Sequence, residues 1–341
     1  MDASDDGTGP TAETPTGRYG AFAREILVLA KERLHVALLQ EHLVYSGGGR
    51  GGLMIPRPFE YHAPAALDEA LKLLTTLDGG PKLLAGGHSL LPMMKLRFVE
   101  AAHLIDLGRI PELRGIHTVG DEIRIGAMTT ESEILRSDLL REQCPLLTEA
   151  VGLISDPQVR YRGTIGGDIC HGDPGNDHPA VMLCLGASFA LRSARGERIV
   201  RADEYFLDTY VTALAQDEIL TEIRIPRPAA GAAACYAKLK RKTGDFATAA
   251  AAVLLSFDGP KVRDVSIALT NVGATALKAR EAESSLRGNP WDELAVNVAV
   301  ELAMAICAPV EDLRGSVEYK RAMAGEMTRR ALRTAAARAS H

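Results

Sequence analysis

Short segments of helical and strand periodicity alternate along the chain from Met54 to about residue 230. Apolar residues at helical spacing predict helices over Ala66–Leu77, from Leu90 behind a Ser89 cap, over Thr130–Leu140 and over Glu149–Ile154. Alternating or continuous apolar runs predict strands over Lys82–Ala85, His103–Leu107, Glu122–Gly126, Val181–Leu191 and Ile219–Ile225. This alternation is typical of α/β units.

The pattern changes after about residue 230, where we expect a domain boundary. Three runs have the length of strands in a meander: Tyr236–Lys240, Ala249–Phe257 and Val262–Asn271. The remainder, Leu277–Ala337, is rich in Ala, Arg and Glu at helical spacing. The C-terminal part is therefore predicted to be a small sheet backed by helices.

Residues 1–53 differ from the rest. A helical pattern over Ala21–Val44 leads into a glycine run that ends at Gly52 and formally matches G-x-G-x-x-G. A dinucleotide fingerprint must follow a buried strand and open a helix, and this run does neither. We expect Met54 to be the true start and residues 1–53 to be an N-terminal extension.

Composition narrows the function. The 341 residues, 46% of them apolar, suit about two domains, and a net charge of -5 argues against nucleic-acid binding. The longest apolar runs are shorter than the ~20 residues of a membrane span, and the acidic N-terminus does not resemble a signal peptide, so we expect a cytoplasmic protein. The five cysteines form no Cys-x-x-Cys pair, which argues against zinc, iron–sulfur and disulfide sites. Redox chemistry would need an organic cofactor.

Two glycine turns carry the first chemical signal. One is Ala85, Gly86, Gly87, His88 and Ser89, and the other is Thr164, Ile165, Gly166, Gly167 and Asp168. Glycine lets backbone N–H groups approach a phosphate without an intervening Cβ, and each turn adds a hydroxyl donor. One such turn is more often plain turn geometry, but two could clamp a pyrophosphate from both sides.

Two further segments carry polar side chains whose roles the sequence leaves open. Cys170–Pro179 holds two His and two Asp in what we predict to be an irregular loop. They could ligate a metal, but we favour Asp177 as an acceptor for a cofactor's sugar or ribityl hydroxyls and Asp173 as a turn cap. In Lys238–Thr248, four cations precede Asp245 and Phe246. They are either a solvated face or a ring-binding edge whose charges favour a reduced, anionic cofactor.

These segments together resemble the FAD-binding subunits of the molybdenum hydroxylases. The similarity starts at Met54 and runs to the C-terminus, and the paired turns are its most specific part. The stretch from Gly172 to Pro179 resembles the medium subunits of aerobic carbon monoxide dehydrogenases in particular.

The resemblance implies an α+β fold of the PCMH/vanillyl-alcohol-oxidase type. Two α/β FAD-binding subdomains, residues 54–108 and 109–230, would precede a C-terminal domain, residues 231–341, with a three-stranded antiparallel sheet and helices. FAD would bind non-covalently, with both turns around its pyrophosphate. Asp177 would lie by its polar chain, and Lys238, Asp245 and Phe246 would approach the flavin.

One residue departs from the family pattern. Asn commonly follows the second glycine pair, whereas this chain has Asp168. Its charge would repel a pyrophosphate unless the side chain points away or is capped by N–H groups. Pyrophosphate contact is then expected from the backbone.

The resemblance also implies a role in electron transfer without any catalytic or metal-ligating residue in this chain. A large subunit with the molybdenum cofactor would oxidise carbon monoxide, a small subunit with 2Fe–2S clusters would relay electrons, and FAD here would pass them to a quinone. A dimer of heterotrimers at the inner face of the cell membrane is the implied assembly. The alternatives are the FAD subunit of a xanthine or N-heterocycle hydroxylase, a stand-alone flavin oxidoreductase and a cofactor-free scaffold.

Overall fold

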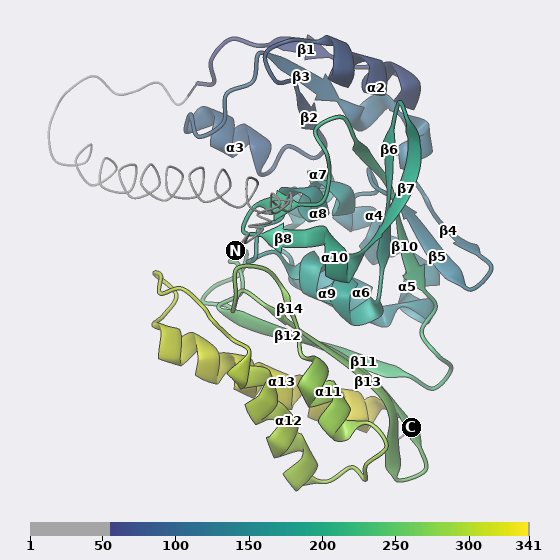
Figure 1. The fold of residues 1–341 in the computed structure, drawn as a ribbon, viewed down its shortest axis with the longest axis vertical. Coiled ribbons are helices and arrows are strands. Elements are labelled where there is room, and N and C mark those ends of the chain that lie inside the picture. The colour runs from purple at the N-terminus through teal and green to yellow at the C-terminus, as the bar shows by residue number, and fades with distance from the viewer. Residues whose placement is uncertain (1–54, 340–341) are drawn as a thin grey trace, which may run out of the picture.

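The computed structural model describes residues 55–339, so the expectations for residues 1–53 and for Met54 lie outside the described part. The first unit is a parallel sheet in the order β1-β3-β2, coloured purple to blue in Figure 1. Its elements are β1 (Glu60–His62), α2 (Leu67–Thr76), β2 (Lys82–Leu84), α3 (Leu90–Lys95) and β3 (His103–Asp106). The predicted helices and strands of this region are confirmed to within two residues. Ser89 precedes α3 as expected, but its side chain makes no capping hydrogen bond.

The second unit is an antiparallel sheet in the order β4-β5-β10-β6-β7. Two short 3-10 turns, Leu107–Arg109 and Pro111–Leu113, connect the first unit to it. The strands are β4 (Ile116–Val119), β5 (Glu122–Gly126), β6 (Ser188–Ser193), β7 (Gly196–Arg201) and β10 (Ile219–Pro226). The helices are α4 (Glu131–Arg136), α5 (Asp138–Gln143), α6 (Pro145–Leu153), α7 (Pro157–Arg162), α8 (Ile165–His171), α9 (Asp177–Leu185) and α10 (Ala202–Tyr205). A two-stranded ribbon, β8 (Phe206–Asp208) and β9 (Val211–Thr212), completes the unit.

Two sequence predictions are wrong here. The predicted strand over Val181–Leu191 is the end of α9 followed by β6. Every residue of α9 is buried, so its apolar pattern has no polar face to reveal the helical period. The single helix predicted over Thr130–Leu140 is two helices, because the backbone at Ser137 is extended and its side chain caps α5.

The third unit is an antiparallel sheet in the order β11-β12-β13-β14, at the bottom of Figure 1. Its elements are β11 (Ala233–Leu239), β12 (Ala249–Asp258), β13 (Lys261–Thr270), β14 (Leu277–Lys278), α11 (Arg280–Leu286), α12 (Glu293–Ala305) and α13 (Val317–Ala339). The three predicted strands are confirmed, but the sheet has a fourth. Leu277 and Lys278 pair with Leu269 and Ala268, too short a strand to interrupt the helical pattern assigned to that stretch.

The third sheet is buried on both faces. Along β12, Ala250 and Ala252 join the core shared with the second unit, while Ala249, Ala251 and Val253 face the core beneath α11, α12 and α13. This explains the continuous run of small apolar residues, which is typical of a strand covered on both sides. None of the described helices is both long and apolar enough to cross a membrane.

Candidate functional site

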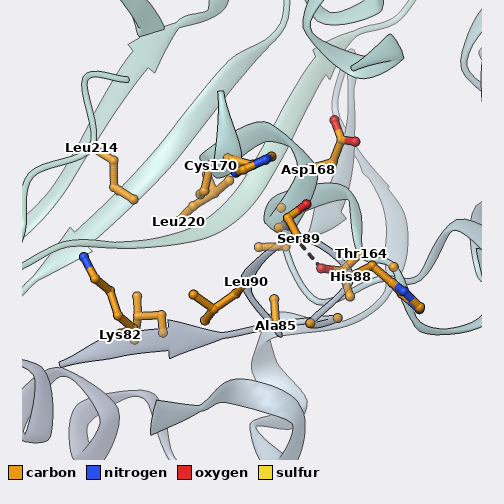
Figure 2. A pocket seen from close by; sticks show the side chains of 18 of the residues that line it. Lys82, Ala85, His88, Ser89, Leu90, Thr164, Asp168, Cys170, Leu214 and Leu220 are labelled. Atoms are coloured by element: carbon orange, nitrogen blue, oxygen red, sulfur yellow. Dashed lines mark hydrogen bonds between the residues drawn. The ribbon is translucent and has the colours of Figure 1, made fainter. Parts of the chain in front are cut away.

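A cavity of about 1100 Å³ lies where the three units meet. It is larger than the ~300–1,000 Å³ typical of small-molecule sites. Every residue predicted to contact the cofactor lines it except Ile165, whose side chain is fully buried in the core. Figure 2 shows Ala85, His88 and Ser89 of the first turn near Thr164 of the second.

The first turn leaves its backbone donors free. Within the described residues, the N–H groups of Gly86, Gly87, His88 and Ser89 have no hydrogen-bond acceptor. Gly87 has a φ of +80°, which favours glycine. A Cβ on Gly86 would lie 2.4 Å from the carbonyl oxygen of Arg162, so this glycine allows the two turns to touch. Free N–H groups beside a cavity are the donors that a phosphate needs.

The second turn uses its donors internally. Ile165 N donates to Thr129 O at 3.1 Å, Gly166 N to Ala127 O at 2.9 Å, and Asp168 N to Thr164 O at 3.0 Å. The glycines lie inside α8 rather than in a loop, and a Cβ on Gly166 would lie 2.6 Å from that of Ala127. This turn therefore holds α8 against the end of β5.

Thr164 is the part of the second turn that stays available to a ligand. Its Oγ1 accepts from Gly167 N at 3.2 Å and caps α8. The hydroxyl proton remains free to donate into the cavity. The turn therefore offers a side-chain donor where the sequence suggested backbone donors.

Asp168 points away from the Ser89 and Thr164 hydroxyls in Figure 2. Its Oδ1 is buried without a hydrogen-bond partner. The pKa of this carboxyl is raised to about 7, chiefly by burial; His178 lowers it, and the negative charges of Glu131, Asp177 and Asp173 add to the rise. The orientation and the raised pKa both reduce the repulsion expected from an aspartate at this position.

Asp177 forms a buried ion pair at the start of α9. Its Oδ2 lies 2.6 Å from Lys238 Nζ, and the two side chains are 6% and 1% exposed. Tyr236 donates its hydroxyl to Asp177 Oδ1 at 2.5 Å, and Lys238 also donates to Leu153 O at 3.3 Å. Burial raises the pKa of Tyr236 well above its ordinary value, so it stays a donor. The cavity wall therefore carries a fixed, neutralised carboxylate with lone pairs to spare.

The irregular loop predicted over Cys170–Pro179 is shorter than expected, because Cys170 and His171 end α8 and α9 begins at Asp177. Polar side chains in this stretch pair with protein groups. His178 Nε2 lies 2.9 Å from Glu131 Oε2, with both side chains buried. Burial lowers the pKa of His178, but the charge and hydrogen bond of Glu131, together with the charges of Asp168 and Asp177, raise the net pKa to about 9. Asp173 accepts from Gly175 N at 2.8 Å, which is the turn cap expected of it.

The cations of Lys238–Thr248 fit both interpretations that the sequence left open, a solvated face and an edge that binds a ring. Lys238 is buried at the cavity, whereas Arg241 and Lys242 are exposed. Asp245 accepts from Arg241 Nε at 3.1 Å and from Arg314 at 2.9 Å. Arg314 also stacks over the Phe246 ring, 5.6 Å from its centroid. Asp245 therefore anchors the loop, and the half-exposed Phe246 ring lines the cavity.

Sequence reasoning missed Tyr236, Glu131 and Arg314. Tyr236 was detectable, because residues two apart on a strand share a face and it precedes Lys238 by two. Glu131 and Arg314 come from distant segments, and no local pattern pairs them with His178 or Asp245.

Comparison with known proteins defines the class. Residues 57–228 match the family model for the FAD binding domain in molybdopterin dehydrogenase. Residues 234–335 match the model for the CO dehydrogenase flavoprotein C-terminal domain. Together these define a flavoprotein chain of the molybdenum hydroxylases.

Similarity to individual proteins shows which branch of this class the chain resembles. The chain is 54% identical to the carbon monoxide dehydrogenase medium chain of Hydrogenophaga pseudoflava over 84% of its own length and 99% of that protein. It is 50% identical to the medium chain of Afipia carboxidovorans, covering 84% and 100%. A solved carbon monoxide dehydrogenase from H. pseudoflava, lacking the Mo-pyranopterin moiety of its cofactor, matches with a TM-score of 0.82 and 56% identity over 83% of this chain and 99% of that one. The chain belongs to the family of FAD-binding medium chains of the carbon monoxide dehydrogenases.

Proposed function

We propose that this chain is the FAD-binding electron-transfer subunit of a molybdenum-containing aerobic carbon monoxide dehydrogenase. It would receive electrons from the 2Fe–2S clusters of a small subunit and pass them to a quinone, while a large subunit oxidises carbon monoxide with water to carbon dioxide. The observation that carries the proposal is the cavity, where free backbone donors and a buried carboxylate come together from segments about 90 residues apart.

The residues of the cavity fit FAD. The free N–H groups from Gly86 to Ser89 and the Thr164 hydroxyl suit the pyrophosphate. Asp177 suits sugar or ribityl hydroxyls, because Lys238 and Tyr236 fix its carboxylate in place. The Phe246 ring and the Lys238 side chain, which both line the cavity, suit the flavin end of the cofactor.

Bound non-covalently, FAD supplies a centre that exchanges electrons singly or in pairs. The chain's own residues bind and orient it. Lys238 lies at the cavity in its ion pair with Asp177, so it holds that carboxylate in place and the pair carries no net charge. Arg314 and Asp245 hold the loop that carries Phe246. No side chain of this subunit is assigned proton transfer to a substrate.

We also propose the finer architecture that the resemblance implies. The three sheets support a division into FAD-binding subdomains at 54–108 and 109–230 and a C-terminal domain at 231–341, with the first two forming the PCMH/vanillyl-alcohol-oxidase type of FAD-binding fold. The complex would be a dimer of heterotrimers in the cytoplasm, meeting its quinone at the inner face of the cell membrane.

The test is an absorption spectrum of the chain in complex with its partner subunits, before and after anaerobic addition of carbon monoxide. We expect a flavin band at about 450 nm that bleaches. Asp177→Asn should weaken the band because Lys238 loses its counter-ion, whereas the matched variant Asp173→Asn should keep it. A band that bleaches only with a purine or N-heterocycle would overturn the carbon monoxide assignment and keep the FAD site. The absence of any flavin would overturn both.

A further inference from the structure

We propose that Glu60, His62 and His103 form a binding site for a zinc ion on the first sheet. None of the three residues lines the large cavity. The site is therefore separate from the proposed FAD site, and neither inference depends on the other.

The strand register brings the three side chains together. β1 and β3 are neighbouring parallel strands, and Glu60 lies opposite His103. His62 is two residues beyond Glu60, and residues two apart on a strand point to the same face. Two imidazoles and one carboxylate therefore share one face of a sheet whose backbone is already fixed by hydrogen bonds.

The spacing of the ligand atoms fits zinc. His62 Nε2 lies 3.2 Å from His103 Nδ1, and Glu60 Oε2 lies 3.4 Å from His103 Nδ1 and 4.0 Å from His62 Nε2. A tetrahedral zinc ion with ligands at about 2.0–2.1 Å has ligand-to-ligand edges of about 3.3 Å. Two of the three edges match this value, and the exposed Glu60 side chain can shorten the third by rotation. An ion at the centre of this triangle would reach all three atoms.

The donor set selects the type of metal. Two imidazoles with one carboxylate suit zinc, whereas calcium and magnesium prefer oxygen ligands alone. The histidines are largely buried, with side chains 23% and 17% exposed, while Glu60 is 74% exposed. One side of the site is therefore open, and water completes the coordination.

The two facing ring nitrogens favour a shared cation. At 3.2 Å one must donate a proton to the other, so the pair holds a single hydrogen bond between two strong metal ligands. A zinc ion replaces this bond with two coordination bonds once the donating ring carries its proton on its other nitrogen, so both rings stay neutral. Binding would hold the three-residue β1, at the edge of its sheet, against β3.

Zinc titration of the full chain with its partner subunits and FAD, after removal of metals by a chelator, tests the site. We expect one zinc per chain from this triad and a rise in the unfolding temperature on binding. His103→Ala should weaken binding by about 100-fold or more, since even changes behind the ligands of known sites cost about 10–100-fold. His117→Ala is the matched control, because His117 is an exposed histidine of β4 outside the triad, and it should bind like the parent.

Two results would contradict the zinc site. Equal zinc affinity in His103→Ala and His117→Ala, or no zinc-dependent rise in unfolding temperature in the parent protein, would overturn the site. If His103→Ala loses the native circular dichroism spectrum, Glu60→Gln replaces it, because this exposed side chain can change without unfolding the sheet. We expect Glu60→Gln to bind zinc about tenfold more weakly, and unchanged affinity in that variant would count against the proposal. An anomalous diffraction peak at the zinc edge between His62 and His103 would confirm the position.

Discussion

The two glycine turns lie against each other in one cavity, yet they use their backbones differently. In the first, Gly86 to Ser89 keep their N–H groups free of acceptors within the described chain. In the second, Ile165, Gly166 and Asp168 donate to carbonyl oxygens of the protein, and Gly167 donates to the Thr164 hydroxyl. The first turn therefore offers free backbone donors to a ligand. The second turn uses its backbone donors to pack α8 against the protein and offers a ligand only the Thr164 hydroxyl.

The difference shows that a glycine pair can have two physical causes. At Gly87 the cause is backbone conformation, because φ is positive. At Gly166 the cause is space, because Ala127 occupies the position of the missing Cβ. Both causes produce the same Gly-Gly pair in the sequence. Only the hydrogen-bond partners of the backbone N–H groups in the structure distinguish a ligand-binding turn from a packing turn.

Removing the charge beneath the second turn should give the largest effect. Glu131 N donates to Gly163 O, and its carboxylate pairs with the buried His178. Glu131→Gln leaves a buried imidazolium without its counter-ion, and we expect a loss of about 3–5 kcal/mol in unfolding free energy at pH 7. Urea denaturation of the FAD-free chain measures it.

The pH dependence of that pair provides an independent check. The pKa of His178 is raised from 6.5 to about 9, so its stabilisation is complete below about pH 6.5 and is lost as the pH rises through 9. Glu131→Gln should remove this loss between pH 7 and 9. If Glu131→Gln keeps the parent's dependence of unfolding free energy on pH, the Glu131–His178 pair does not stabilise the second turn.

Gly166→Ala should be the next most damaging change. The new Cβ would lie 2.6 Å from the Cβ and carbonyl oxygen of Ala127, so α8 must move away from β5. Overpacking of this kind costs about 1–3 kcal/mol, and we expect a value near the upper end in the absence of FAD.

Gly152→Ala is the control for that substitution. Gly152 lies in α6, and its Cβ would meet only Leu135 at 3.9 Å. Alanine is a better helix former than glycine, so this variant should be unchanged or more stable by up to about 1 kcal/mol. Equal destabilisation by both alanines in urea denaturation would refute the steric account of Gly166.

The sequence predicted the local elements well and the distant pairings poorly. The strand before the first turn and the three strands of the C-terminal meander follow from apolar period and length alone. The helix α9 does not, because burial on all sides removes the periodicity that distinguishes it from a strand. Likewise, Asp177 and Lys238 were each singled out, but their 2.6 Å ion pair depends on how α9 packs against the third sheet, which no local pattern encodes.

Charge also distinguishes the two turns, because only the second carries a carboxylate, Asp168. Its pKa is raised from 3.8 to about 7, chiefly by burial. The folded chain therefore holds the proton more tightly than the unfolded chain, and its stability falls as the pH rises from about 4 to about 7. Asp168→Asn should remove this fall, whose steepest slope is about 1.4 kcal/mol per pH unit.

Urea midpoints between pH 4 and 6.5 measure the slope below the range in which the His178 pair loses its stabilisation. The matched control is Asp258→Asn, an exposed aspartate at the end of β12, which should keep the parent's slope. A parent protein whose stability does not change over this range would contradict the assignment of the shift to burial.

The smallest effect compares the hydroxyls of the two turns. Thr164 Oγ1 accepts from Gly167 N, whereas the Ser89 side chain makes no capping bond. Thr164→Ala should therefore cost about 1 kcal/mol of unfolding free energy, and Ser89→Ala less than about 0.5 kcal/mol. Thr164→Ser restores the acceptor and should recover the loss. FAD binding would depend on the proton that each hydroxyl donates, whereas the helix cap depends on the oxygen that accepts. If both hydroxyls contact the pyrophosphate, FAD titration should therefore show an affinity about tenfold lower in both alanine variants, although only Thr164→Ala is destabilised. Equal destabilisation by the two substitutions would mean that the turns do not differ in the way their hydrogen bonds indicate.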